Sequence, residues 1–274
     1  MSARFWFGTS SWNYKDWAGV FYSPAVSPKQ MLAEYARIFP TVEIDSTYYG
    51  IPRATSVESW RTSVGDGFRF SLKTPSSITH ERRFTHADRV FAVFLDRIRP
   101  LGEKIGAVLL QCPPDFGPTR DNRNALFGFL ETELPAGIRI ALELRDERWY
   151  DAQLYAHARV NHFTLAMTEG SRASITHAAR IAAELAADPP ADFAYIRWLG
   201  DQALPRYDRV QLDRSGSMDA WERMLRTIEP TVSDIFAYAS NDYEGFAPAT
   251  VRGMLARLGQ PVPPETAELR LFDA

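Results

Sequence analysis

Eight short apolar segments recur along the chain at intervals of tens of residues, and each ends in polar residues. They cover residues 5–11, 41–47, 67–73, 105–112, 138–145, 162–168, 193–198 and 235–240. Helical patterns lie between them, such as residues 28–39 and 90–98, where apolar side chains recur on one helix face. Strands that alternate with helices predict an α/β protein with a parallel sheet, and eight such units favour a TIM-type (β/α)8 barrel, regular or irregular in detail.

An open, doubly wound sheet is the alternative arrangement of the same elements. Its nucleotide-binding forms carry a Gly-x-Gly-x-x-Gly or Gly-Lys-Ser/Thr loop after a strand, and no such loop follows any of the eight segments. The chain has no repeat, low-complexity tract or linker long enough to separate domains. We therefore predict a single domain over residues 1–274, in which residues 260–274 form a C-terminal tail.

The charge of the chain bears on its partners. The formal net charge is -3, from 31 basic and 34 acidic residues, so no overall positive field attracts nucleic acid or anionic lipid, although a local basic patch would. Cys112 is the only cysteine, which excludes an intramolecular disulfide and fits a reducing cytosol. No apolar window reaches the length of a membrane-spanning helix. We expect a cytoplasmic protein with no membrane partner.

Residues 138–149 show where the chemistry lies. Side chains alternate between the two faces of a strand, so Glu143 and Arg145 share one face at the end of a predicted strand. Ligands bind at the carboxyl ends of strands in α/β proteins. The same alternation at the other strand ends sends further polar side chains to the barrel axis, namely Glu43, Asp45, Lys73, Gln111 and Arg197, with Asn241 and Asp242 just past the last strand.

These residues admit two interpretations. They could form a structural network, because charges inside a barrel must be paired. A purely structural barrel would more cheaply use Val, Ile and Leu at these positions, so we favour a functional site. We predict that Glu43 and Glu143 are an acid/base pair and that Lys73 and His80 are further candidate catalytic residues. Arg145, Arg197 and Lys73 would hold negative charge on a ligand.

Aromatic residues also cluster in or just after the strand ends, among them Trp12, Tyr48 and Trp149. Flat rings beside charged groups suit sugar rings or bases, although any one ring could instead pack a loop against a helix. We predict ligand contacts from Trp12, Asp45, Tyr48, Gln111, Arg145, Trp149, Arg197, Asn241 and Asp242.

A metal site is a further alternative. Glu43, Asp45, Glu143, Asp242 and His80 offer oxygen and imidazole ligands for Mg or Mn. No His-x-His or His-x-x-x-His spacing is present, and nearby Lys and Arg side chains would compete for the carboxylates. We therefore predict no metal-ligating residues and no firmly implied cofactor, while a divalent metal stays open.

The sequence resembles the YecE-like family, also called domain of unknown function seventy-two. The resemblance covers nearly the whole chain and rests on residues 8–17, 21–22, 42–49, 70–73, 78–80, 109–114, 143–145, 241–242 and 245–248. It implies a (β/α)8 barrel and no established reaction. Two positions depart from the family pattern. Asp45 stands where members usually have Asn, and Leu199 replaces a His, which removes a candidate acid, base or ligand.

These observations predict an enzyme, hydrolase-like or isomerase-like, that acts on a small anionic or polyhydroxylated ligand in a polar, aromatic-rimmed pocket at the strand ends. The alternative is a nucleic-acid-binding or phosphodiesterase-like protein, with or without a metal.

Overall fold

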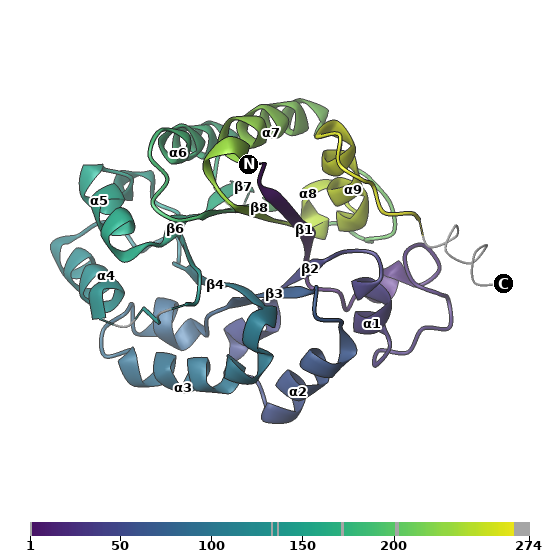
Figure 1. The fold of residues 1–274 in the computed structure, drawn as a ribbon, viewed down its shortest axis with the longest axis horizontal. Coiled ribbons are helices and arrows are strands. Elements are labelled where there is room, and N and C mark those ends of the chain that lie inside the picture. Colours follow the sequence, from purple (N-terminus) through teal and green to yellow (C-terminus); the bar gives the residue numbers. More distant parts are fainter. Residues whose placement is uncertain (1, 133, 136, 171–172, 201–202, 266–274) are drawn as a thin grey trace.

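The computed structural model describes residues 2–132, 134–135, 137–170, 173–200 and 203–265. They form a barrel of strands inside a ring of helices, seen along the barrel in Figure 1. The strands are β1 (Arg4–Ser10), β2 (Thr41–Ile44), β3 (Arg69–Lys73), β4 (Ile105–Gln111), β5 (Ile140–Glu143), β6 (Thr164–Leu165), β7 (Met167–Gly170), β8 (Phe193–Gly200) and β9 (Asp234–Ala239).

All strand pairs are parallel, and their order is β6-β5-β4-β3-β2-β1-β9-β8-β7. The predicted (β/α)8 barrel is therefore confirmed, with one irregularity. The predicted strand over residues 162–168 divides at Ala166 into β6, which pairs with β5, and β7, which pairs with β8. The chain between them joins the two ends of the sheet.

Nine α-helical segments lie in the described ranges: α1 (Met31–Ala36), α2 (Ala54–Ser63), α3 (Asp88–Ile98), α4 (Arg120–Thr132), α5 (Ala152–Asn161), α6 (Ile175–Ala187), α7 (Ser215–Ile228), α8 (Asn241–Glu244) and α9 (Ala247–Arg257). Short 3-10 turns are η1 (Lys15–Trp17), η2 (Asp45–Tyr49), η4 (Arg99–Lys104), η5 (Glu147–Trp149) and η6 (Glu229–Thr231), and η3 (Ser77–Glu81) is a π-helical turn. The predicted helix over 90–98 lies within α3, whereas only residues 31–36 of the one predicted over 28–39 are α-helical.

The barrel interior is filled in layers, as packed (β/α)8 barrels are. The middle layer is apolar and aromatic, with Leu109, Phe193, Tyr195, Phe236 and Tyr238 beside small alanines. The amino-terminal layer is polar, and there Arg4, Trp6 and Arg139 all donate to buried Asp234. A larger apolar core separates the strands from the helices. Side chains therefore fill the lower layers of the barrel interior, and (β/α)8 barrels bind their ligands at the carboxyl ends of the strands.

No helix within the described ranges has both the length and the apolar character needed to cross a membrane. Of the predicted tail over residues 260–274, the part from 266 on lies outside the described residues. Residues 260–265 form no helix or strand, and Arg252 donates to the carbonyl oxygens of Pro263 and Pro264.

Candidate functional site

Arg197 joins the polar side chains at the carboxyl end of the barrel. Its Nε and Nη2 donate to Glu43 Oε2 and Oε1 at 2.9 and 2.7 Å, and its Nη1 donates to Glu143 Oε2 at 2.7 Å. Nη1 also lies 3.3 Å from Gln111 Oε1. Strand register explains why Arg197 reaches both Gln111 and Glu143, because these two residues lie side by side on the paired strands β4 and β5. Arg145 Nε then donates to Glu143 Oε1 at 2.9 Å.

Further donors hold the carboxyl groups of Glu43 and Glu143 in place. Ser10 Oγ and Tyr195 Oη donate to Glu43 at 2.9 and 2.7 Å. Burial opposes ionisation of Glu143, but Arg197 and Arg145 outweigh it and hold its pKa below the ordinary value. Both glutamates are buried, at 0% and 1% exposure.

The predicted acid/base role of Glu43 and Glu143 is therefore not supported by their contacts. Glu43 and Glu143 do not line the pocket above them, and all four of their carboxylate oxygens accept hydrogen bonds from protein donors. They hold Arg197 in place and leave proton transfer to groups that face the pocket.

The pocket at the barrel mouth, called the mouth pocket below, has a volume of about 350 Å³. It is lined by Asp45, Tyr48, Tyr49, Lys73, Gln111, Arg145, Arg197, Leu199, Ser240 and Asp242. Seven of these were predicted as catalytic or ligand-contacting residues. Tyr49, Leu199 and Ser240 were not, although each follows from its position: Tyr49 is next to Tyr48 in η2, Leu199 follows Arg197 by two residues along β8, and Ser240 is the first residue past β9.

Asp45 is the titratable carboxyl in the wall of this pocket. Its Oδ1 lies 3.6 Å from Arg197 Nη2, and this oxygen is buried without a hydrogen-bond partner among the described residues, although 37% of the side chain is exposed. Burial raises the pKa of Asp45 to about 6, and neighbouring Glu43 adds to the rise, while Arg197 and Lys73 oppose it. Asp45 therefore exchanges its proton near neutral pH.

Lys73 is half-buried at the end of β3, with its Nζ 4.2 Å from the centre of the Tyr48 ring. Burial and the nearby Arg197 lower the pKa of Lys73. His80 lies behind Tyr48, with ring centres 5.0 Å apart, and its Nδ1 is 2.8 Å from Thr79 Oγ1. Burial and Lys73 lower the pKa of His80. His80 does not line the mouth pocket, so the prediction of direct catalysis by His80 is not supported.

Three predicted ligand contacts lie elsewhere. Trp149 is fully buried, donates to the Phe116 carbonyl at 2.6 Å and stacks on the Phe116 ring, so its prediction as a stacking platform is wrong. Buried Asn241 accepts from Trp17 Nε1 and from the backbone of α9. Trp12 packs edge-on against a ring of α2 rather than lining the pocket.

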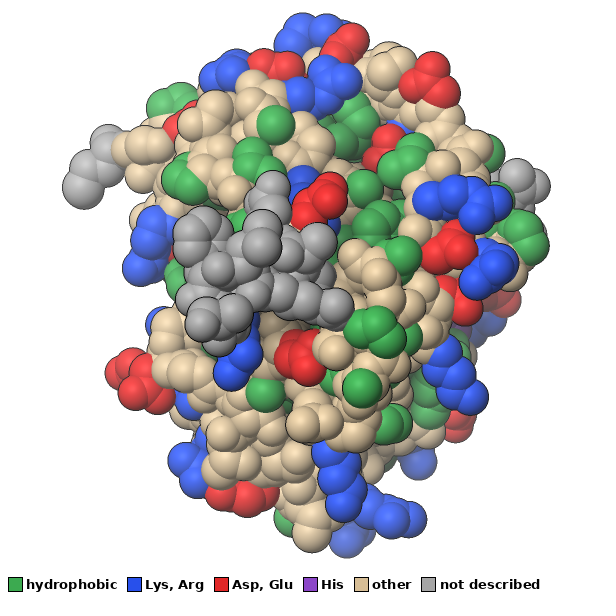
Figure 2. All heavy atoms as spheres, turned by 90° about the vertical axis from the view of Figure 1, so that its right-hand side faces the viewer, with side chains coloured by type: hydrophobic (Ala, Val, Ile, Leu, Met, Phe, Trp, Pro, Cys, Tyr) green, Lys and Arg blue, Asp and Glu red, His purple; other side chains and the backbone are tan. Residues whose placement is uncertain are grey.

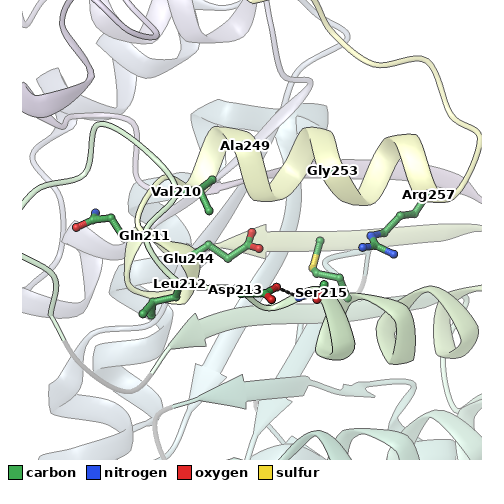
Figure 3. A pocket seen from close by; sticks show the side chains of 10 residues that line it. Val210, Gln211, Leu212, Asp213, Ser215, Glu244, Ala249, Gly253 and Arg257 are labelled. Atoms are coloured by element: carbon green, nitrogen blue, oxygen red, sulfur yellow. Dashed lines mark hydrogen bonds between the residues drawn. The ribbon is translucent and has the colours of Figure 1, made fainter.

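Larger cavities lie outside the barrel. One of about 470 Å³ lies between α7, α9 and residues 210–213, as Figure 3 shows. Its wall combines apolar side chains with Glu244, while Arg257 pairs with Asp219 and Asp213 accepts from the Ser215 backbone. We assign the functional site to the smaller mouth pocket, because charged groups from five strands converge there.

The metal alternative finds no ligand set. Within the described residues, no three or more His, Cys, Asp and Glu side chains form a group that could hold a metal ion. The geometry gives the reason, since Arg197 occupies the oxygens of Glu43 and Glu143 that such a site would use.

Known proteins share both the sequence and the fold. Residues 6–269 match the family described as "Protein of unknown function DUF72". The chain is 34% identical over 143 residues to UPF0759 protein YecE of Escherichia coli (strain K12), a match that covers 52% of this chain and 49% of that protein. The match therefore spans about half the length of this relative.

Solved structures extend the likeness to the whole barrel. A DUF72 family protein from Thermotoga maritima MSB8 superposes with a TM-score of 0.76 at 22% identity, covering 94% of this chain and 100% of that one. A mandelate racemase/muconate lactonizing enzyme-like protein from Rubrobacter xylanophilus gives 0.50 at 11% identity, over 92% of this chain and 55% of that one. At these identities the likeness shows the fold alone, so the barrel has distant structural neighbours among enzymes. The family match over residues 6–269 places the chain in the DUF72 family.

Proposed function

We propose that the protein is an enzyme that moves a proton on a small anionic substrate bound in the mouth pocket. Asp45 is the acid/base group, and Arg145 supplies positive charge to the substrate's carboxylate or phosphate, while Lys73 faces the same pocket. The observation that carries the proposal is the buried Oδ1 of Asp45, which has no hydrogen-bond partner in the described part of the chain. Such a group is costly in a structural network and useful where a substrate completes its bonding.

The position and pKa of Asp45 fit this role. A general acid or base works best when its pKa is near the working pH, and the pKa of Asp45 is about 6. It lines the pocket together with the basic side chains of Lys73, Arg145 and Arg197, so an anion bound there would lie beside Asp45 and these groups. The pocket volume of about 350 Å³ fits a small metabolite-sized ligand.

Isomerase-like chemistry is favoured over sugar hydrolysis. Glycosidases place two carboxyl groups on either side of the bond that breaks. Glu43 and Glu143 cannot serve, because they lie beneath the pocket and bind Arg197. A single carboxyl that takes and returns one proton is sufficient for an isomerase or racemase.

Solvent hydrogen exchange tests the proposal without knowledge of the final product. The protein is incubated in deuterated water with a panel of small oxo acids, hydroxy acids and sugar phosphates, and loss of carbon-bound proton signals is followed by NMR. We expect enzyme-dependent exchange for at least one compound, and a loss of roughly 100-fold or more in Asp45→Asn. Asp96→Asn, on the exposed side of α3, is the matched control and keeps the exchange. Exchange that is absent throughout, or that survives in Asp45→Asn, would overturn the proposal.

A further inference from the structure

Lys73 is an amine facing a ligand pocket without an anionic partner. Its Nζ makes no hydrogen bond or ion pair with any residue in the described ranges, and it lies over the Tyr48 ring, 4.2 Å from the ring centre. Arg197 in the same pocket is instead saturated by Glu43 and Glu143. The charges of Asp45, Glu143 and Glu43 attract the half-buried ammonium group of Lys73, but none of these side chains forms an ion pair with Nζ, so the position of Lys73 calls for another explanation.

The surroundings of Lys73 favour its neutral form more than those of a surface lysine. Burial removes water from the ammonium group, and the fixed charge of Arg197 repels it, so the pKa of Lys73 is lowered. The charges of Asp45, Glu143 and Glu43 and the face of the Tyr48 ring act in the opposite direction, because they attract a cation, but burial and Arg197 outweigh them. The neutral amine that results from a lowered pKa is the nucleophilic form, and lysines in such surroundings attack carbonyl groups.

We propose, resting on the proposed function, that Lys73 forms a Schiff base with its substrate, which is a small carbonyl compound that carries a carboxylate or phosphate group. The mouth pocket holds the three groups that this chemistry needs. Lys73 is the nucleophile, Arg145 supplies charge for the anionic group, and Asp45 moves protons. All three lie at or just past the carboxyl ends of β2, β3 and β5, where side chains are held by the barrel wall.

The steps balance as follows. Nζ of neutral Lys73 attacks the carbonyl carbon, a C–N bond forms, and a proton passes from nitrogen to the former carbonyl oxygen. The protonated Asp45 carboxyl then gives its proton to this hydroxyl, which leaves as water and leaves a cationic C=N bond. That cation withdraws electrons and acidifies the adjacent C–H bond, whose proton the newly formed Asp45 carboxylate accepts. Asp45 thus serves as acid first and base second, for which a pKa of about 6 is suited.

Borohydride trapping tests the inference directly. The protein is mixed separately with pyruvate, glyoxylate, dihydroxyacetone phosphate and ribose 5-phosphate, then treated with sodium borohydride, which reduces a C=N bond to a stable amine. The chain has four lysines, Lys15, Lys29, Lys73 and Lys104, so peptide mass spectrometry resolves each one. We expect at least one compound to label Lys73 roughly tenfold or more above the exposed Lys15 and Lys29.

Two variants serve as controls. Lys73→Arg keeps the positive charge but cannot form the C=N bond, so labelling at this position disappears while a melting curve reports whether the variant folds. Lys104→Arg alters a lysine that donates to the carbonyl oxygens of Arg61 and Val64 at the end of α2. This variant should keep the label on Lys73. Labelling of Lys73 no greater than that of Lys15 with every compound would overturn the inference. If the same compounds still exchange protons with solvent through Asp45, the proposed function stands without the Schiff base.

Discussion

Among single residues, Arg197 determines the arrangement of the site. Burying the Arg197 guanidinium inside the barrel is tolerated because the charges of Glu43 and Glu143 neutralise it. Burial alone would lower the pKa of Arg197, but these charges outweigh burial and raise the pKa well above its usual range. Removing one partner of a buried pair typically costs roughly 3–5 kcal/mol. The two glutamates therefore do structural work, and the ionisable group that can respond to a ligand is Asp45.

The state of Asp45 should control anion binding. Its pKa is about 6, so the mouth pocket is one charge more positive below that pH than above it. Sulfate keeps its charge across this range, and we expect its affinity to be roughly tenfold higher at pH 5 than at pH 8. Isothermal titration calorimetry at the two pH values measures this. His80 contributes in the same direction, because its imidazole carries less positive charge at higher pH.

Asp45→Asn separates the two contributions. It places at this position the residue that the family resemblance expects, and it removes the Asp45 titration while leaving His80 unchanged. The variant should show a smaller difference in sulfate affinity between the two pH values, and the difference that remains is the contribution of His80. An unchanged pH dependence in Asp45→Asn would show that Asp45 does not set the charge of the pocket.

At the scale of elements, the β8 end and α8 come into unusually close contact. Gly200 has a φ of +72°, and a Cβ there would lie 1.9 Å from the Asp242 carbonyl oxygen. This approach brings the end of β8, with Leu199, against the first turn of α8, and Leu199 and Asp242 both line the mouth pocket. Glycine is therefore required by the backbone path as well as by the conformation.

Gly200→Ala should destabilise the protein. The left-handed conformation and the clash with Asp242 together should lower the free energy of unfolding by about 2–4 kcal/mol. Gly128→Ala is the matched control, because Gly128 lies on the exposed side of α4 with nothing near its Cβ position. That variant should be about 0.5–1 kcal/mol more stable than the parent. Urea unfolding measures both, and equal effects of the two substitutions would contradict the explanation.

The elements were the most predictable level of the structure. The period of two correctly turned Glu43, Gln111 and Arg197 toward the barrel axis, because strand geometry alone fixes that alternation. Depth along the axis has no such signal. Glu43 and Asp45 are two residues apart and were predicted on the same face, yet Glu43 is fully buried whereas Asp45 lines the mouth pocket. Trp149 was misplaced for a related reason, since a ring after a strand can pack inward as readily as outward.

At the scale of the whole molecule, basic and acidic side chains are mixed on the face that Figure 2 shows. The face shown in Figure 2 carries Lys and Arg side chains interspersed with Asp and Glu, in keeping with the net charge of -3. Phosphate backbones are bound by clustered positive charge, which this face does not present among its described residues. The polar groups instead converge inside the barrel mouth, on the scale of a small molecule.

The division of the sixth strand gives the barrel wall a seam. Within the described residues, β6 pairs with β5 through two residue pairs and β7 pairs with β8, while the centre of β9 is bonded on both sides. Opening along that seam would break the fewest hydrogen bonds, so the wall can part there without unfolding the remaining strands. We expect the amides of Leu165 and Thr168 to exchange with deuterated solvent through a low-energy local opening, faster than those of Phe236 and Ala237 in β9. Native-state hydrogen exchange in increasing denaturant would show this as two separate openings. A single opening shared by all four amides would contradict the prediction, because it would mean that the barrel opens as one cooperative unit although hydrogen bonding is interrupted between β6 and β7.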